Sequence, residues 1–111
     1  MMTLKQLIEP MELRVLVEGD LSRPVTGGTC GDLLSWVMGR AQADSVWITV
    51  MGNVNAVAVA VLADVACILL AEDAPLDDAA RQKAEAQGVT VLQSSQAIYQ
   101  LAVRLSHLLE S

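Results

Sequence analysis

Stretches of alternating or continuous hydrophobic residues predict four β-strands. Leu13, Val15 and Val17 alternate with Arg14, Leu16 and Glu18, which is the period-two pattern of a strand with two different faces. Residues 46–50 are rich in β-branched and aromatic side chains, and residues 66–70 form an apolar run without polar alternation. Such a run is typical of a strand in a parallel sheet that is covered on both faces. Residues 89–92 predict a short fourth strand.

Between these strands the apolar residues recur at helical spacing. We expect a short helix over residues 3–9 that begins at Thr3 and is ended by Pro10. A second helix is capped by Asp32 and buries a stripe from Leu33 to Ala41. The other expected helices begin at Asn55, at Asp77-Asp78, and at Ser94 or Ser95, and the fourth ends at Gly88. The segment from Asn55 to Leu62 alternates Val with Ala, so a strand is the alternative there.

The resulting order αβαβαβαβα predicts an α/β fold. We expect a mostly parallel sheet of about four strands with helices on both faces, formed by residues 1–111 as a single domain. Ligands of such sheets tend to lie beyond the carboxyl ends of the strands. In this sequence those ends carry residues 20–29, 51–55, 72–75 and 93–95.

Composition removes several classes of function. The chain is 53% hydrophobic and 18% charged, so disorder is not expected. Its formal net charge of −6 and its 3% of aromatic residues disfavour a nucleic-acid partner. The apolar stretch over residues 54–71 is interrupted by Asn55 and Asp64 and is too short on either side to span a membrane. No leader sequence is evident, so we expect a cytoplasmic protein without a membrane anchor.

Few residues offer catalytic or metal-binding chemistry. The two cysteines, Cys30 and Cys67, lie far apart and form no metal-binding motif, and His107 is the one histidine. Cys30 precedes an expected helix start, where a thiolate would be favoured, although a small loop residue is the simpler interpretation. The acidic pairs at residues 72–73 and 77–78 are expected to be solvated. We therefore predict no catalytic residues, no metal, no cofactor and no enzyme activity.

A glycine-rich segment before the second helix is a candidate binding site. Its residues present backbone N–H groups at an expected helix N-terminus, which suits an anion such as phosphate. The alternative is purely structural: the two glycines supply positive φ for a turn, and the aspartate caps the helix. The candidate ligand residues here are Thr26, Gly27, Gly28, Thr29 and Asp32.

Two further features sit outside that segment. Asn53 and Asn55 flank an expected strand-to-helix turn, where they either contact a ligand or form an Asx turn and an N-cap. Trp47 lies in an expected strand and is assigned to the core, whereas Trp36 falls off the apolar stripe of its helix. Trp36 and Met38 are therefore the candidate residues of a subunit interface.

Five segments in the same order resemble the DRTGG domain family. They are Val25-Thr26-Gly27-Gly28, residues 31–35, residues 47–49, residues 53–60 and residues 68–70, and the resemblance extends over about residues 13–105. Thr26-Gly27-Gly28 match the name-giving motif, whereas Pro24-Val25 stand where the family has Asp-Arg. Any ligand contact that depends on that Asp and Arg is missing here, and Arg23 is the available substitute.

The resemblance implies a small α/β domain, similar in fold to the N-terminal domain of HPr kinase. Family members occur alone, beside the catalytic domain of phosphotransacetylases, and between paired CBS modules of some pyrophosphatases. They are regulatory or associative, and dimers are common. We therefore expect a non-catalytic regulatory domain that binds a small nucleotide or phosphate-bearing ligand and forms a homodimer. The alternative is an interaction or scaffold subunit of a redox or metabolic enzyme complex without a small ligand.

Overall fold

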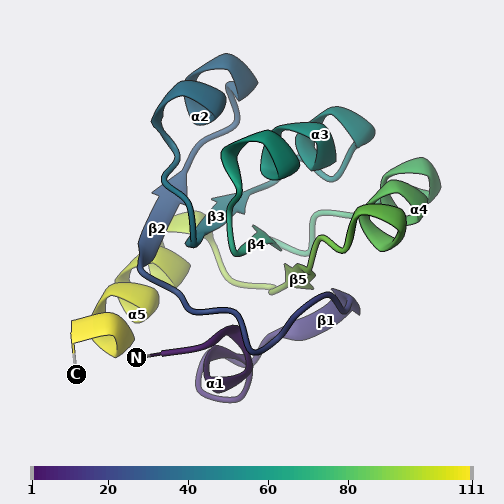
Figure 1. Ribbon diagram of the computed structural model, residues 1–111. Helices are drawn as coiled ribbons and strands as arrows, with labels where there is room; N and C mark the ends of the chain where they lie inside the picture. Colours follow the sequence, from purple (N-terminus) through teal and green to yellow (C-terminus); the bar gives the residue numbers. More distant parts are fainter. Residues whose placement is uncertain (1, 111) are drawn as a thin grey trace.

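A five-stranded sheet lies between two layers of helices in the computed structural model, which describes residues 2–110 (Figure 1). The strands are β1 (Arg14–Val17), β2 (Gly27–Cys30), β3 (Ser45–Thr49), β4 (Cys67–Leu70) and β5 (Val91–Gln93). The helices are α1 (Leu4–Ile8), α2 (Leu34–Arg40), α3 (Val54–Ala63), α4 (Asp78–Gln87) and α5 (Ile98–Glu110). Figure 1 shows α2, α3 and α4 on one face of the sheet and α1 and α5 on the other.

The strand order is β1-β5-β4-β3-β2, and all neighbours are parallel except the pair β1–β5. The expected α/β class with a mostly parallel sheet is therefore confirmed, with five strands in place of about four. The additional strand is β2, Gly27-Gly28-Thr29-Cys30, where the two glycines predict a turn. Glycine is depleted in strands, so the pattern gave no strand signal there, and pairing with β3 imposes the extended conformation.

Alternate residues of the central strands face different helical layers. Val46 and Ile48 of β3 pack with Leu101 and Leu105 of α5, whereas Trp47 between them packs on the opposite face with α3. Trp47 is completely buried, as predicted. Because both faces are covered, β3 and β4 are apolar at consecutive positions, which explains the unbroken hydrophobic runs in the sequence.

Several helix starts differ from the predictions. α3 is a helix, not the alternative strand, and its cap is Asn53 and not Asn55: Asn53 Oδ1 accepts a hydrogen bond from the Ala56 N–H at 2.8 Å. α2 begins after Leu33, so Asp32 is not its N-cap. α5 begins at Ile98, and the Ser94 hydroxyl accepts from the Gln96 N–H in the preceding turn.

Neither Gly27 nor Gly28 has a positive φ, so the expected tight turn is wrong. The glycine with φ of +153° is Gly31, directly after β2. Gly28 is needed for a different reason, because a Cβ atom there would lie 2.8 Å from Leu105 Cδ2 of α5. The glycine thus lets α5 approach the sheet closely.

Because β1 runs antiparallel to the other strands, it also changes which loops meet at the carboxyl end of the parallel strands. The parallel strands end at Cys30, Thr49, Leu70 and Gln93, and β1 begins beside the last of these, with Arg14 opposite Gln93. Residues 20–26, which were expected at the carboxyl ends, therefore lie toward the amino ends of the parallel strands. Among residues 2–110, no helix combines the length and the apolar character that crossing a membrane requires.

Candidate functional site

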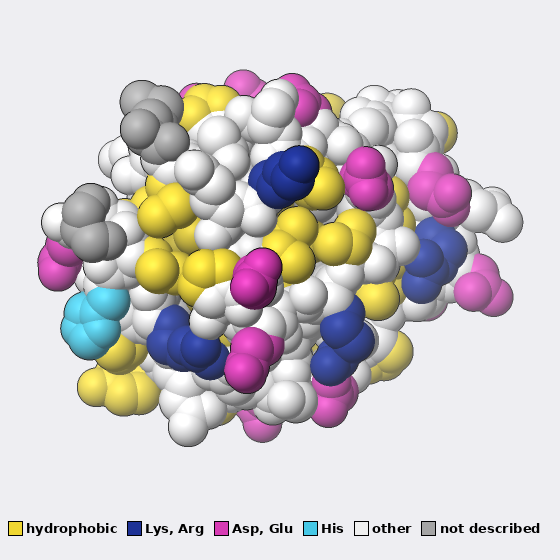
Figure 2. All heavy atoms as spheres, turned by 90° about the horizontal axis from the view of Figure 1, so that it is seen from below, with side chains coloured by type: hydrophobic (Ala, Val, Ile, Leu, Met, Phe, Trp, Pro, Cys, Tyr) yellow, Lys and Arg dark blue, Asp and Glu magenta, His cyan; other side chains and the backbone are white. Residues whose placement is uncertain are grey.

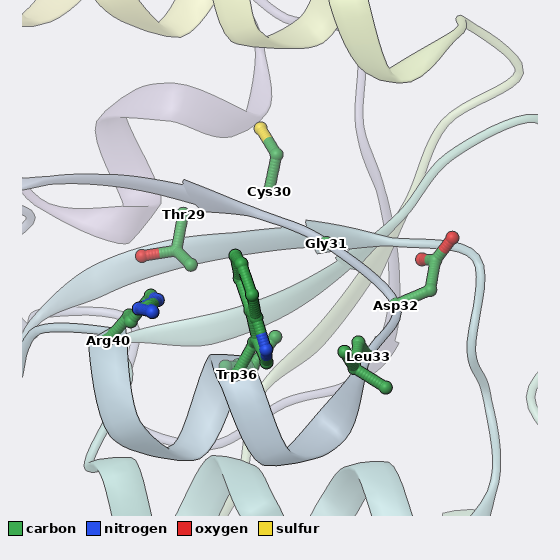
Figure 3. Close-up of a pocket in the computed structure, with 8 residues that line it drawn as sticks. Thr29, Cys30, Gly31, Asp32, Leu33, Trp36 and Arg40 are labelled. Atoms are coloured by element: carbon green, nitrogen blue, oxygen red, sulfur yellow. The ribbon is translucent and has the colours of Figure 1, made fainter.

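A pocket of about 250 Å³ lies between the end of β2 and α2. Its walls come from β2 and the turn that follows it on one side, and from α2 on the other (Figure 3). It is lined by Thr29, Cys30, Gly31, Asp32, Leu33, Trp36, Val37 and Arg40.

Trp36 forms the central wall of this pocket. Its side chain is 59% exposed, although it belongs to the largest apolar residue type. The guanidinium carbon of Arg40, one helical turn further on, lies 4.1 Å from the centre of the Trp36 ring, which is cation–π distance. Figure 3 shows the indole rising from α2 toward β2, with Arg40 on one side and Leu33 and Asp32 on the other. The pocket therefore has a cation and an aromatic surface, and Asp32 lines its other end with its carboxylate directed away from Trp36.

The turn at the end of β2 is held in place from β3. Trp47 Nε1 donates a hydrogen bond to the Gly31 carbonyl oxygen at 2.9 Å. Asp32 Oδ1 accepts from Thr49 Oγ1 at 2.8 Å, and Thr49 is completely buried. Two side chains at the end of the central sheet thus fix the backbone of Gly31 and Asp32. A pre-ordered wall of this kind lowers the entropic cost of binding a ligand.

The structure divides the residues that we predicted to form one site. Thr29 and Asp32 line the pocket. Thr26 lies at the opposite end of β2, where its N–H donates to the Asp44 carbonyl at 3.0 Å. Asn53 is engaged as the cap of α3, and Asn55 is exposed on that helix. The predicted helix N-terminus that would attract an anion does not follow these glycines directly, because they lie within a strand.

Gly27 and Gly28 line a second groove, between β2 and α5, with a volume of about 340 Å³. Its other walls include Ala102, Leu105 and Leu109 of α5. Figure 2 views the molecule from the side of α1 and α5 and shows hydrophobic side chains gathered there between acidic and basic ones. The partly buried apolar residues of this side are Met2, Leu21, Ile98, Ala102, Leu108 and Leu109.

Cys30 is exposed on β2, and Figure 3 shows its sulfur directed to the side away from Trp36. Partial burial of the thiol raises its pKa above the ordinary value. The alternative of a thiolate favoured by a helix start is therefore wrong, because the strand offers no helix dipole to lower the pKa, and Cys30 lies in β2 and not in the expected loop. Cys67 is completely buried, and burial raises its pKa to about 12. The two sulfur groups lie on different strands, one on the sheet edge and one inside the core.

Arg23 has a structural role that the sequence did not reveal. Its Nε donates to Asp44 Oδ1 at 2.9 Å, and its Nη2 donates to Asp64 Oδ1 at 2.8 Å. These ion pairs raise the pKa of the guanidinium, against the opposing effect of its partial burial. Arg23 thereby ties the segment before β2 to the start of β3 and the end of α3. It lies away from the β2–α2 pocket and does not supply that pocket with a cation.

The acidic side chains form no metal centre among residues 2–110, where no group of three or more His, Cys, Asp or Glu converges. Asp77 caps α4 by accepting from the Ala80 N–H at 2.7 Å. Asp73 forms an ion pair with Arg14 on β1, at the carboxyl edge of β5. His107 is exposed in the last turn of α5, as expected.

Comparison with known proteins supports the fold. No family model and no curated protein matches the chain. A matching solved structure is that of the CBS and DRTGG domains of the regulatory region of Clostridium perfringens pyrophosphatase, complexed with its activator, diadenosine tetraphosphate. The TM-score is 0.75 at 10% sequence identity, and the match covers 93% of this chain and 45% of the other. The chain thus spans slightly less than half of that regulatory region, and its fold is DRTGG-like.

Proposed function

We propose that the protein is a non-catalytic regulatory domain whose ligand is a nucleotide, held in the pocket between β2 and α2. The observation that carries the proposal is the arrangement of Trp36 between Arg40 and Asp32. A nucleotide has three parts that need three kinds of partner: an aromatic base, a polar sugar and an anionic phosphate. The pocket offers an aromatic surface, a carboxylate that accepts hydrogen bonds, and a guanidinium.

The base is expected to stack on the indole of Trp36. Base–aromatic stacking contributes about 1–3 kcal/mol per base, and the base would stack on the ring face of Trp36 that Arg40 does not cover. Arg40 lies at the pocket end farther from Asp32, so the phosphate is placed there, where a guanidinium forms charge-assisted hydrogen bonds. Asp32 Oδ1 is bonded to Thr49, so the second carboxylate oxygen, Oδ2, would accept from a sugar hydroxyl or from an amino group of the base.

Support from outside the chain comes from the solved neighbour, a regulatory region that was crystallised with a dinucleotide activator. The proposal takes from it the class of function, regulation by a nucleotide, and not the position of the site. We further propose that residues 1–111 act as one domain, that the domain is a homodimer, and that it works in the cytoplasm. Two unpaired cysteines, one of them exposed, suit a reducing compartment.

A competing function is that of an interaction subunit, in which Trp36 contacts a protein and not a base. The exposure of Leu33 and Met38 beside Trp36 favours it. The two functions differ in what removal of the indole does to small-ligand binding.

Isothermal titration calorimetry with adenine and guanine nucleoside mono- and diphosphates and with dinucleotides, each with and without magnesium, tests the proposal. We expect saturable binding by the wild type, at least tenfold weaker binding by Trp36→Ala, and weaker binding of phosphorylated ligands by Arg40→Gln. Tyr99→Ala is the matched control, because Tyr99 is 78% exposed on α5, away from the pocket lining. Failure of every nucleotide to bind, or equal binding by Trp36→Ala, would contradict the proposal and favour the interaction subunit.

A further inference from the structure

The two edges of the sheet are protected very differently. At the β1 edge, the pairing with β5 shifts register between Val15 and Val17. Arg14 contributes a charged side chain there, and Arg81 Nη1 of α4 donates to the Leu16 carbonyl at 2.6 Å. Bulges, charges and covering side chains are the devices by which natural sheets prevent their edges from pairing with other chains. The β1 edge therefore has three of them.

The β2 edge has none of these devices. β2 consists of Gly27, Gly28, Thr29 and Cys30, without charge or proline, and its register with β3 is regular over all four residues. β3 is its partner on one side, and Figure 1 shows no other element of the described chain along its outer side. A regular uncharged strand with one open side presents backbone N–H and C=O groups to a further strand.

Apolar surface flanks this open edge on both faces of the sheet. On the α2 side, Leu33 and Trp36 are 60% and 59% exposed. On the α5 side lies the groove of about 340 Å³, whose partly buried apolar residues include Ala102 and Leu109. The α2 layer, the sheet and the α5 layer therefore all expose surface at the β2 edge, and one partner could cover all three.

We propose that β2 pairs antiparallel with β2 of a second copy across a twofold axis at Thr29, so that one sheet runs through both copies. This inference deepens the homodimer part of the proposed function and does not depend on the identity of the ligand. The β2–β2 pairing places α2 beside the partner's α2 on one face of the sheet and α5 beside the partner's α5 on the other face. The pocket between β2 and α2 then lies at the subunit interface.

The two charged residues at the ends of the pocket are complementary to each other when two copies pair antiparallel. Asp32 follows the carboxyl end of β2, and Arg40 lies at the other end of the same pocket. An antiparallel pair brings the Arg40 end of one copy beside the Asp32 end of the other, twice across the axis. A parallel pair would bring like charges together. Complementary charges at an interface fix orientation and register.

Side-chain direction selects the register. Residues directly opposite each other in an antiparallel pair point to the same face, so the axis must pass through a residue and not between two. An axis at Thr29 places Thr29 opposite the partner's Thr29, a favourable cross-strand pair. It also places Cys30 opposite the partner's Gly28, which has no side chain to collide with the thiol. An axis at Gly28 would pair two glycines and gain no side-chain contact.

Sedimentation of the ligand-free protein at micromolar concentration, with three edge variants, tests the inference. We expect the wild type and Cys30→Ala to be dimers and Cys30→Lys to be a monomer, because the lysines of both copies would lie close to the axis. Val15→Lys, which places the same charge at the β1 edge, is expected to stay dimeric. A monomeric wild type, a dimeric Cys30→Lys, or a monomeric Val15→Lys that remains folded by circular dichroism would overturn the proposed interface.

Disulfide trapping gives the register independently of any loss of folding. In the Cys30→Ser background, Thr29→Cys is expected to form a covalent dimer under mild oxidation, since residue 29 faces itself across the axis. Val15→Cys in the same background is the control and should remain uncrosslinked. Crosslinking through Val15→Cys in place of Thr29→Cys would refute the register. Neither measurement uses a nucleotide, so a dimer without nucleotide binding overturns only the ligand part of the proposed function, and a nucleotide-binding monomer overturns only this inference.

Discussion

Replacement of Gly28 by valine is the most revealing perturbation of the fold near the site. A Cβ atom at Gly28 would lie 2.8 Å from Leu105 Cδ2, closer than side chains pack, and Leu105 is only 3% exposed. α5 must therefore move away from β2, or Leu105 must leave its rotamer. Overpacking of this kind costs about 1–3 kcal/mol, and valine adds two methyl groups beyond the Cβ. We expect a loss near 2 kcal/mol for Gly28→Val and less for Gly28→Ala.

The neighbouring glycine is a matched control. A Cβ at Gly27 has no heavy atom within 4 Å, and its φ is not positive. Gly27→Ala is therefore expected to be neutral, or to stabilise by up to about 1 kcal/mol through the lower entropy of the unfolded chain. The comparison separates a steric effect at one residue from a general cost of side chains in β2.

Urea unfolding, followed by circular dichroism at one fixed protein concentration, provides the measurement. Urea slopes for small domains are roughly 1–3 kcal/mol per molar, so a loss of 2 kcal/mol lowers the midpoint by about 1 M. Leu105→Ala should relieve the clash, so that the double variant loses less stability than the sum of the two single changes. Equal midpoints for Gly28→Ala and Gly27→Ala, or strict additivity of Gly28→Val with Leu105→Ala, would refute the close approach of α5.

Three further predictions concern a cap, a hydrogen bond and a thiol. Asn53→Ala should lower the free energy of unfolding by about 1 kcal/mol because it removes the cap of α3, whereas Asn55→Ala should have almost no effect; equal effects in urea unfolding would contradict the assigned cap. Trp47→Phe should lower the free energy of unfolding by at least about 1–3 kcal/mol, because the Gly31 carbonyl loses its indole donor. Hydrogen exchange at the amides of Gly31 and Asp32 should accelerate. Unchanged exchange would show that the turn is held by other contacts. Burial raises the pKa of the Cys30 thiol, so the thiol ionises at higher pH in the folded protein than in the unfolded chain. Iodoacetamide at pH 9 should therefore label Cys30 more slowly in buffer than in urea, as followed by mass spectrometry of the Cys30 peptide. Faster labelling of the folded protein would contradict the burial effect.

The strands that are buried on both faces were predictable because their signal is strong. β3 and β4 are apolar at every position except Ser45 and Thr49, and helices separate them at regular intervals. The class of fold and the buried position of Trp47 follow from that pattern. The exposure of Trp36 agrees with its position off the predicted apolar stripe, but the stripe itself was only partly correct, because Leu33 and Met38 are 60% and 49% exposed.

β2 and the split of the candidate site were not predictable from local sequence. Two adjacent glycines favour a turn, and only the hydrogen bonds to β3 make them a strand. Once β2 is a strand, Thr26 and Asp32 lie at its opposite ends, so no single loop contains them. The sequence does not mark Arg40 as a site residue, because a charged residue at the end of a helix is common. Its proximity to Trp36 depends on the helical turn and has no signature beyond the spacing of four.

The most direct test of the central claim, a nucleotide held against Trp36, is the indole region of a ¹H–¹⁵N correlation spectrum. The chain has two tryptophans, so two indole signals report on the pocket: Trp36 in its wall and Trp47 behind the Gly31 turn. Titration with a nucleotide should shift the Trp36 signal most, the Trp47 signal less, and the amides of Gly31 and Asp32 together with them. Saturable shifts that leave Trp36 unchanged, or no shifts with any nucleotide, would contradict the account.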